Sequence, residues 1–71
     1  MPYVNIKVTR ERGGVTAQQK KELIVRTSRM LQEVLDKDPA TTFVVIDEVE
    51  TDSWGVGLES VTERRARERG G

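Results

Sequence analysis

Pro2 is the first residue whose type and place could do chemistry. It directly follows Met1, so removal of Met1 would leave a free secondary amine. An α-amino group has a pKa of about 8 in unperturbed peptides, and apolar surroundings or nearby cations lower that pKa. A base poised near neutral pH suits proton abstraction next to a carbonyl, and the fixed φ of proline would hold the amine in one place. Because many chains begin Met-Pro without catalytic consequence, Pro2 gains meaning only from its surroundings.

Two arginines and a tryptophan are candidates for those surroundings. Arg10 and Arg12 follow an extended segment that starts at Pro2, and a guanidinium group binds a planar carboxylate through two parallel hydrogen bonds. Trp54 stands between polar residues and Gly55, where its ring could form the apolar wall of a pocket. Taken singly, the arginines fit a solvated loop and Trp54 fits core or interface packing. Taken with Pro2, they indicate a site for a small-molecule carboxylate substrate.

Composition limits the alternatives. The 71-residue chain has no histidine and no cysteine, so acid–base chemistry falls to a carboxylate, a lysine or the chain terminus. Carboxylates alone are poor zinc ligands and no glycine-rich phosphate loop is present, so we expect no metal and no other cofactor. The formal net charge is +0 and no apolar run could span a bilayer, which favours neither nucleic acid nor a membrane as partner. The lack of cysteine fits a cytoplasmic protein.

Two segments have the pattern of strands. Across residues 2–9 apolar side chains alternate with polar ones, as in a half-buried strand. Residues 41–46 are mostly apolar at both odd and even positions, as in a central strand that is covered on both faces. A third segment, residues 54–57, reads Trp-Gly-Val-Gly and indicates a tight turn or short hairpin.

A helix is predicted between the two strands. Thr16 followed by Gln19 is a capping-box pattern that starts the helix, and Pro39 ends it. Its apolar positions share one face: Leu23, Ile24, Thr27, Leu31, Val34 and Leu35. The last residues, 62–71, are rich in arginine and lack an apolar stripe, so we interpret them as a frayed helix or a disordered end.

The order strand, helix, strand predicts an α+β fold. We expect a single β-α-β unit with parallel strands, a right-handed crossover and a short C-terminal hairpin over residues 1–61, followed by the tail 62–71. A chain this short buries only about 60% of the surface that its unfolded form exposes. Its β-α-β unit also leaves two strand edges and one sheet face open. Because disulfides are excluded, we expect a homo-oligomer that joins through sheet edges and faces.

Three segments together resemble the 4-oxalocrotonate tautomerase family: PYVNIKVTR at residues 2–10, Gln19-Lys20 with Leu23-Ile24, and WGVGLES at residues 54–60. The resemblance extends from Pro2 to about Ser60. It implies a tautomerase/MIF-like β-α-β subunit, assembled as a hexamer of three dimers with active sites near subunit contacts. It also implies that the amino-terminal proline acts as base and then acid on an unsaturated dicarboxylate such as 2-hydroxymuconate.

The resemblance assigns roles by position. Pro2 matches the catalytic proline, Arg12 the arginine that binds a substrate carboxylate, and Trp54 the aromatic residue that makes the pocket apolar. Arg10 competes with Arg12, because the loop at residues 13–14 is longer than in short family members. One position departs from the pattern, since Phe43 stands where prototype members carry a second arginine. An arginine from the tail of a neighbouring subunit could replace it: Arg64, Arg65, Arg67 or Arg69.

Three functions therefore remain open. The first is a tautomerase or isomerase acting on an enol or dienol carboxylate. The second is another reaction of the same proline, such as haloacrylate dehalogenation, hydration, decarboxylation or a Schiff-base condensation. The third is a non-catalytic oligomeric module that keeps the fold. The related 3-haloacrylate dehalogenases use an acidic residue two positions after the aromatic to activate water, and Val56 stands there in this chain, which disfavours hydrolytic dehalogenation.

Overall fold

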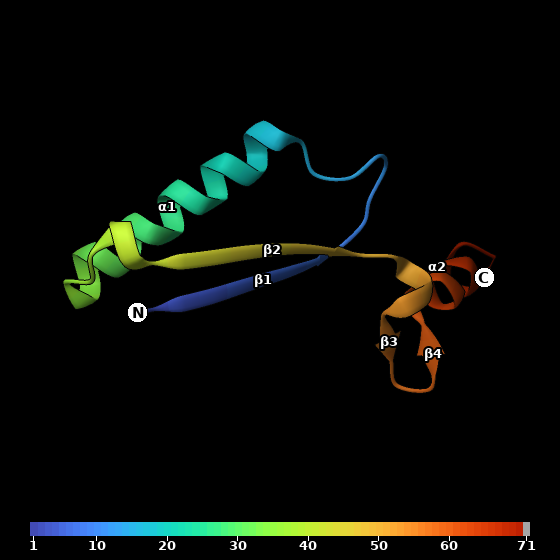
Figure 1. Ribbon diagram of the computed structural model, residues 1–71. Helices are drawn as coiled ribbons and strands as arrows, with labels where there is room; N and C mark the ends of the chain where they lie inside the picture. The colour runs from blue at the N-terminus through green and yellow to red at the C-terminus, as the bar shows by residue number, and fades with distance from the viewer. Residues whose placement is uncertain (71) are drawn as a thin grey trace.

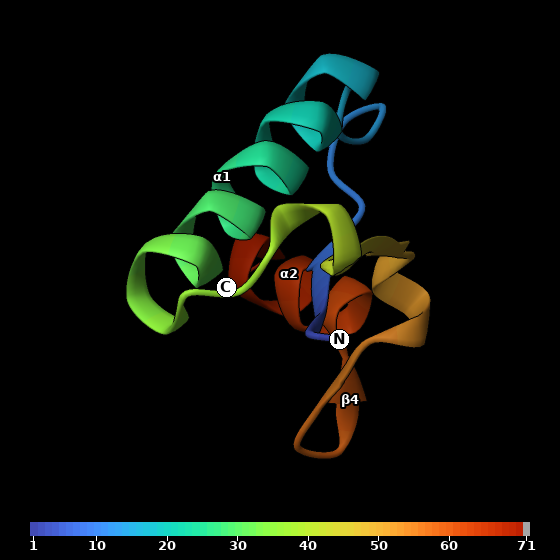
Figure 2. The ribbon, with the colours of Figure 1, turned by 60° about the vertical axis from the view of Figure 1, so that its left-hand side comes forward.

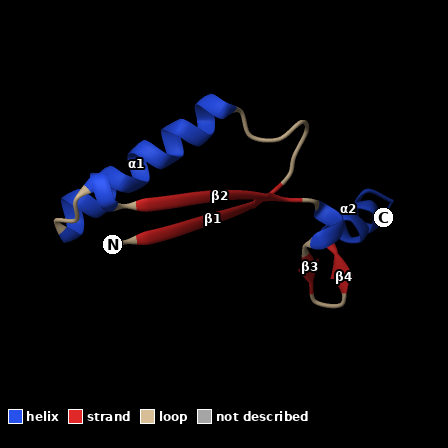
Figure 3. Cartoon of the chain, viewed as in Figure 1, coloured by secondary structure: helices blue, strands red, loops and turns tan. Residues whose placement is uncertain are grey.

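The structure is a computed structural model that describes residues 1–70. Two long strands with a long helix between them come first, and a small hairpin and a second helix follow (Figures 1 and 3). In chain order the elements are β1 (Tyr3–Thr9), α1 (Ala17–Leu35), the 3-10 helix η1 (Pro39–Thr41), β2 (Phe43–Val49), the 3-10 helix η2 (Thr51–Ser53), β3 (Gly55–Val56), β4 (Glu59–Ser60) and α2 (Val61–Gly70).

The sheet confirms the predicted β-α-β unit. β1 and β2 pair in parallel, from Tyr3 opposite Phe43 to Thr9 opposite Val49. α1 lies over one face of this sheet, and the hairpin of β3 and β4, antiparallel as expected, projects away on the opposite side (Figures 1 and 2). The α+β prediction, with its parallel strands and C-terminal hairpin, is therefore confirmed.

Only one face of the sheet is covered within the chain. Side chains alternate along a strand, so Val44, Ile46 and Glu48 share the face under α1, where the Glu48 carboxylate lies 3.0 Å from the Lys20 ammonium nitrogen. The other face presents Tyr3 and Phe43, which pair in register and are 64% and 52% exposed. The pattern of residues 41–46 predicted cover on both sides, and a single chain provides it on one.

The predicted helix begins where its capping box indicates. The Thr16 hydroxyl accepts a hydrogen bond from the Gln19 amide at 3.0 Å, and the Gln19 side chain accepts one from the Thr16 amide at 2.9 Å. The helix ends at Asp36, which adopts a left-handed conformation with a φ of 56°. No helix among residues 1–70 is both long and apolar enough to cross a membrane.

The arginine-rich tail, expected to be a frayed helix or a disordered end over residues 62–71, forms the helix α2 up to Gly70, and residue 71 lies outside the described residues. A second capping box starts this helix. The Ser60 hydroxyl accepts from the Glu63 amide at 3.1 Å, and the Glu63 carboxylate accepts from the Ser60 amide at 2.9 Å. Ion pairs replace the missing apolar stripe, since Arg65 binds Glu11 and Arg67 binds Glu59. The helix is thus held by capping, by ion pairs and by Val61 at its first position, which is buried.

The single chain is elongated and has almost no core. Its radius of gyration is 16.0 Å and its longest dimension 48 Å, whereas a compact chain of this length has a radius of gyration of about 11 Å. Its accessible surface is 5653 Å², against about 4450 Å² for a compact monomer of this mass. Among residues 1–70 only Val61 and Ser28 are buried, while Leu58 at the hairpin tip is fully exposed. These values fit one subunit of an assembly.

Candidate active site

Backbone pairing fixes Pro2 at one end of the sheet. The Pro2 carbonyl accepts a hydrogen bond from the Phe43 amide at 2.9 Å, directly ahead of the Tyr3–Phe43 pair. Pro2 itself is half-buried, whereas Met1 is 86% exposed. The Pro2 nitrogen is acylated by Met1 in this chain and has no basicity in that form. The exposure of Met1 leaves the bond between them open to processing.

Arg10 continues the strand pairing at the opposite end of the sheet. Its amide donates to the Val49 carbonyl at 2.8 Å, and its Nε lies 3.7 Å from a carboxylate oxygen of Glu50. The chain then turns sharply, with φ values of 28° at Arg12 and 87° at both Gly13 and Gly14. Arg12 is exposed on this turn. Both candidate carboxylate-binding arginines are therefore held by one short loop.

A nearly buried carboxylate anchors that loop. The Glu48 side chain is 8% exposed and accepts a hydrogen bond from the Val15 amide at 2.6 Å, in addition to its pair with Lys20. The Val15 hydrogen bond, followed by the one from Lys20, holds the pKa of the Glu48 carboxyl below its ordinary value. Glu48 stays ionised near neutral pH and ties the loop to both β2 and α1.

Gly14 is the position in this loop where a side chain does not fit. A Cβ atom there would lie 2.6 Å from Oε1 of Glu48 and 3.4 Å from the guanidinium carbon of Arg10, whereas one at Gly13 would meet nothing within 4 Å. Both glycines share a φ of 87°, so their substitution carries the same kind of backbone strain. The two positions therefore form a matched pair.

Gly14→Ala should destabilise the protein more than Gly13→Ala. We expect Gly13→Ala to lower the free energy of unfolding by about 1–2 kcal/mol through left-handed strain. Gly14→Ala adds about 1–3 kcal/mol, because the Glu48 carboxylate is displaced from its partners. Urea denaturation at one fixed protein concentration measures the difference, and equal losses for the two variants would contradict the anchoring role of Glu48.

Trp54 lies at the same end of the sheet as the arginines. Its amide donates to the Thr51 carbonyl at 3.4 Å and its carbonyl accepts from the Val61 amide at 2.8 Å, so it links η2 to the start of α2. The half-buried indole lines an open cavity of about 390 Å³ together with Lys7 and Val49. Lys7 and Val49 belong to the sheet face that α1 leaves uncovered, so Trp54 lies beside that face.

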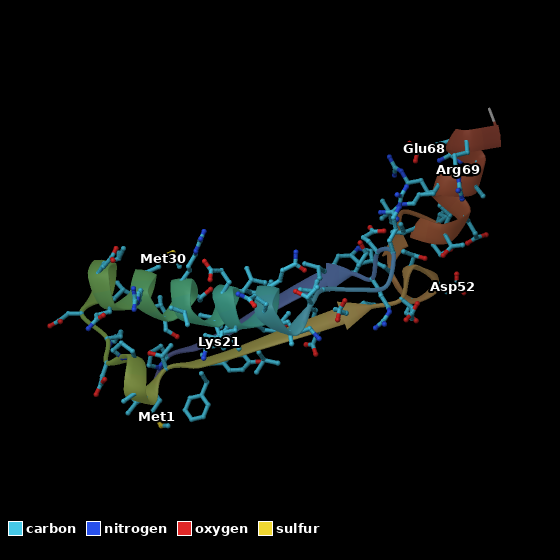
Figure 4. The ribbon with its side chains drawn as sticks, turned by 90° about the horizontal axis from the view of Figure 1, so that it is seen from above. Met1, Lys21, Met30, Asp52, Glu68 and Arg69 are labelled. Carbon is cyan, nitrogen blue, oxygen red and sulfur yellow. The ribbon has the colours of Figure 1, made fainter. Side chains whose placement is uncertain are left out.

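The structure does not bring Pro2 together with Arg10, Arg12 and Trp54 in one chain. An extended strand rises about 3.3 Å per residue, which separates Pro2 from Arg10 by roughly 26 Å over eight steps. Figure 4 shows the same separation, with Met1 at one end of the molecule and Asp52, Glu68 and Arg69 at the other. A site containing all four predicted residues therefore requires two subunits.

Two of the four tail arginines that the sequence offered as replacements for the missing second arginine lie beside the arginine loop of their own chain. Arg65 donates from both terminal nitrogens to the two oxygens of Glu11, at 2.7 and 2.6 Å. Arg69, one turn further along α2, lines the same cavity as Arg10 and Arg12. The arginine content of the tail indicated such a role, but the partner Glu11 is 54 residues away in the sequence and no local pattern identifies it.

Comparison with known proteins agrees with the fold and identifies the family. The family model described as "Tautomerase enzyme" matches residues 2–64, from the proline to the second turn of α2. A relative from Dickeya dadantii, "Probable tautomerase K2", is 62% identical over 92% of this chain and 94% of its own length. The crystal structure of DmpI from Helicobacter pylori superposes with a TM-score of 0.83 at 43% identity, over 92% of this chain and 97% of that one. A heterohexamer 4-oxalocrotonate tautomerase from Chloroflexus aurantiacus superposes with a TM-score of 0.73 at 28% identity, over 89% and 97% of the two chains.

The parallel β-α-β subunit with its C-terminal hairpin is the fold of small oligomeric tautomerases. The chain belongs to the 4-oxalocrotonate tautomerase family. Membership supports a proline-dependent tautomerase or isomerase in general terms, and the structural relatives of this chain are oligomers.

Proposed function

We propose that the chain, once Met1 is removed, catalyses keto–enol tautomerisation of an enol or dienol carboxylate such as 2-hydroxymuconate in the cytoplasm. The Pro2 nitrogen accepts the enol hydroxyl proton and the carbonyl bond forms. The displaced electron pair moves through the conjugated system, and the prolinium returns its proton to a substrate carbon. The position of Pro2 is the observation on which the proposal rests. The Phe43 amide donates a hydrogen bond to the Pro2 carbonyl and so fixes Pro2 at the end of the sheet, and the match to the family model begins at this residue.

The arginine loop supplies the carboxylate contact. Arg12 is the better candidate, because it forms no ion pair among residues 1–70, whereas Arg10 lies near Glu50 and continues the backbone pairing. A cation beside the substrate also disfavours the protonated amine and keeps Pro2 available as a base. Trp54 contributes an apolar wall that weakens competition by water.

A homo-oligomer, which we propose to be a hexamer of three dimers, completes the site. The uncovered sheet face with Tyr3 and Phe43, together with Leu58 at the hairpin tip, offers apolar surface to neighbouring subunits. A neighbour's arginine loop and Trp54 then lie beside Pro2. This arrangement is supported by the separation of the two half-sites within one chain and by the heterohexamer among the structural relatives.

Arginine substitutions test the assignment. Arg12→Ala should raise the apparent KM for 2-hydroxymuconate about tenfold or more while changing kcat little, because the ion pair to the carboxylate is present in both ground and transition states. Arg10→Ala serves as the matched variant in the same loop, with a smaller effect expected on KM. Initial rates followed by ultraviolet absorbance measure both variants, and wild-type kinetics in each would exclude this loop from the site.

A further inference from the structure

A cavity of about 510 Å³ lies between the arginine loop and α2. Its charged lining consists of four arginines and two glutamates: Arg10, Arg12, Arg65, Arg69, Glu11 and Glu68. Four positive and two negative side chains leave a formal excess of two positive charges. We name this space the α2 cavity. In Figure 4, Glu68 and Arg69 mark its α2 side.

Two arginines of α2 that line the cavity lie close enough to repel each other. Arg65 and Arg69 are four residues apart, so they share one face of the helix, where like charges destabilise each other. That face is turned toward Arg10 and Arg12. The guanidinium of Arg69 makes one hydrogen bond among residues 1–70, a long one of 3.4 Å from Nε to the Arg65 carbonyl. An anion in the cavity would relieve this repulsion.

The Glu11–Arg65 pair indicates which anion fits. Both carboxylate oxygens of Glu11 accept from the two terminal nitrogens of Arg65, the geometry by which arginine binds carboxylates. These hydrogen bonds, joined by one from Thr9, lower the pKa of Glu11 to about 2. Both side chains are about half exposed, so a second carboxylate can reach Arg65 from solvent and compete with Glu11. Glu11 thus occupies the place of a ligand carboxylate.

We propose that the α2 cavity binds the remote carboxylate of a dicarboxylate substrate, through Arg65 and Arg69 together with Arg12, and that Glu11 competes for the same arginine. The proposal rests on the function proposed above and deepens it, because it makes α2 the element that selects dicarboxylates over monocarboxylates. The match to the family model ends at residue 64, so Arg65 and Arg69 lie beyond the part of the chain that matches the family.

Paired substrates test this selection. 2-Hydroxymuconate carries the remote carboxylate, and 2-hydroxy-2,4-pentadienoate lacks it. Arg65→Gln and Arg69→Gln should each raise KM for the dicarboxylate about tenfold and leave KM for the monocarboxylate unchanged. Arg64→Gln is the matched control, because Arg64 pairs with Glu68 along the helix and does not line the cavity. A parallel rise for both substrates in Arg65→Gln and Arg69→Gln would overturn the proposal.

Glu11→Gln separates competition from a structural role. If the Glu11–Arg65 pair only holds α2 in place, Glu11→Gln and Arg65→Gln impair the enzyme in the same direction. If Glu11 competes with the substrate, Glu11→Gln lowers KM for the dicarboxylate while Arg65→Gln raises it. The opposite signs support the proposal, and equal signs contradict it.

A binding measurement separates this proposal from the proposed function. Arginine Nε–H resonances of the processed protein are followed by NMR during titration with fumarate, a dicarboxylate, and with crotonate, its monocarboxylate counterpart. We expect fumarate to shift the Arg65 and Arg69 signals and crotonate to leave them in place. Turnover of 2-hydroxymuconate without such shifts would overturn dicarboxylate binding in the α2 cavity and leave the proposed tautomerase function standing. Shifts without any turnover support dicarboxylate binding at α2 and overturn the tautomerase.

Discussion

Pro2→Ala should lower kcat/KM for ketonisation of 2-hydroxymuconate by about 10²–10⁴-fold, the range that a positioned general base contributes. Alanine keeps an amino terminus but loses the ring that fixes φ, so the amine is no longer held against the site. The oligomer should persist, because the backbone bond from the Phe43 amide to the residue 2 carbonyl is kept. Both proteins are first checked by intact mass spectrometry for loss of Met1.

Pro39→Ala is the control for this experiment. Pro39 opens η1 and lines a cavity with Ser28 and Gln32 of α1, on the covered side of the sheet, so its replacement should leave the rate at the wild-type level. Size-exclusion chromatography with light scattering verifies the assembly of each variant. A Pro2→Ala protein that is correctly processed, assembled and fully active would remove Pro2 from the mechanism.

Two impaired variants should regain kcat/KM for 2-hydroxymuconate when they are assembled together. Pro2→Ala subunits keep the arginine loop, and subunits with both Arg10→Ala and Arg12→Ala keep Pro2. If each site takes Pro2 from one subunit and arginines from another, random mixing of equal amounts restores about one site in four. The restoration follows from the roughly 26 Å between Pro2 and Arg10 along β1.

The mixture is made by joint refolding from urea, and each variant refolded alone is the control. A kcat/KM near a quarter of that of the refolded wild type, measured at substrate concentrations below KM, is the expected result. Activity that stays at the level of the separate variants, in hybrids whose formation native mass spectrometry verifies, would place Pro2 and the arginines in the same subunit's site and contradict the shared arrangement.

Local sequence patterns predicted the elements well because local interactions form them. The capping box at Thr16 set the start of α1, and alternation across residues 2–9 gave β1, observed as Tyr3–Thr9. The parallel pairing followed from a strand, helix and strand of ordinary lengths. β2 runs three residues past the predicted end at residue 46, to Val49. The prediction stopped short because Asp47 and Glu48 are charged and interrupt the apolar pattern.

The arrangement of the candidate site was less accessible to sequence reasoning. Pro2 and Arg10 are close in sequence but lie at opposite ends of an extended strand, so sequence proximity suggested a contact that one chain does not make. The helical tail carried a readable pattern in Ser60 and Glu63, which form its capping box. The pair between Arg65 and Glu11 depends on tertiary placement alone.

The central claim is that the Pro2 amine is the base, and titrating that amine tests it most directly. The processed protein is labelled with ¹⁵N-proline, and the Pro2 nitrogen is followed by NMR across pH while kcat/KM for 2-hydroxymuconate is measured under the same conditions. The pH dependence of kcat/KM reports the essential groups of the free enzyme. We expect the rise in kcat/KM to follow deprotonation of the Pro2 nitrogen, and to disappear in Pro2→Ala. A rise at a different pH from the nitrogen titration would contradict the assignment.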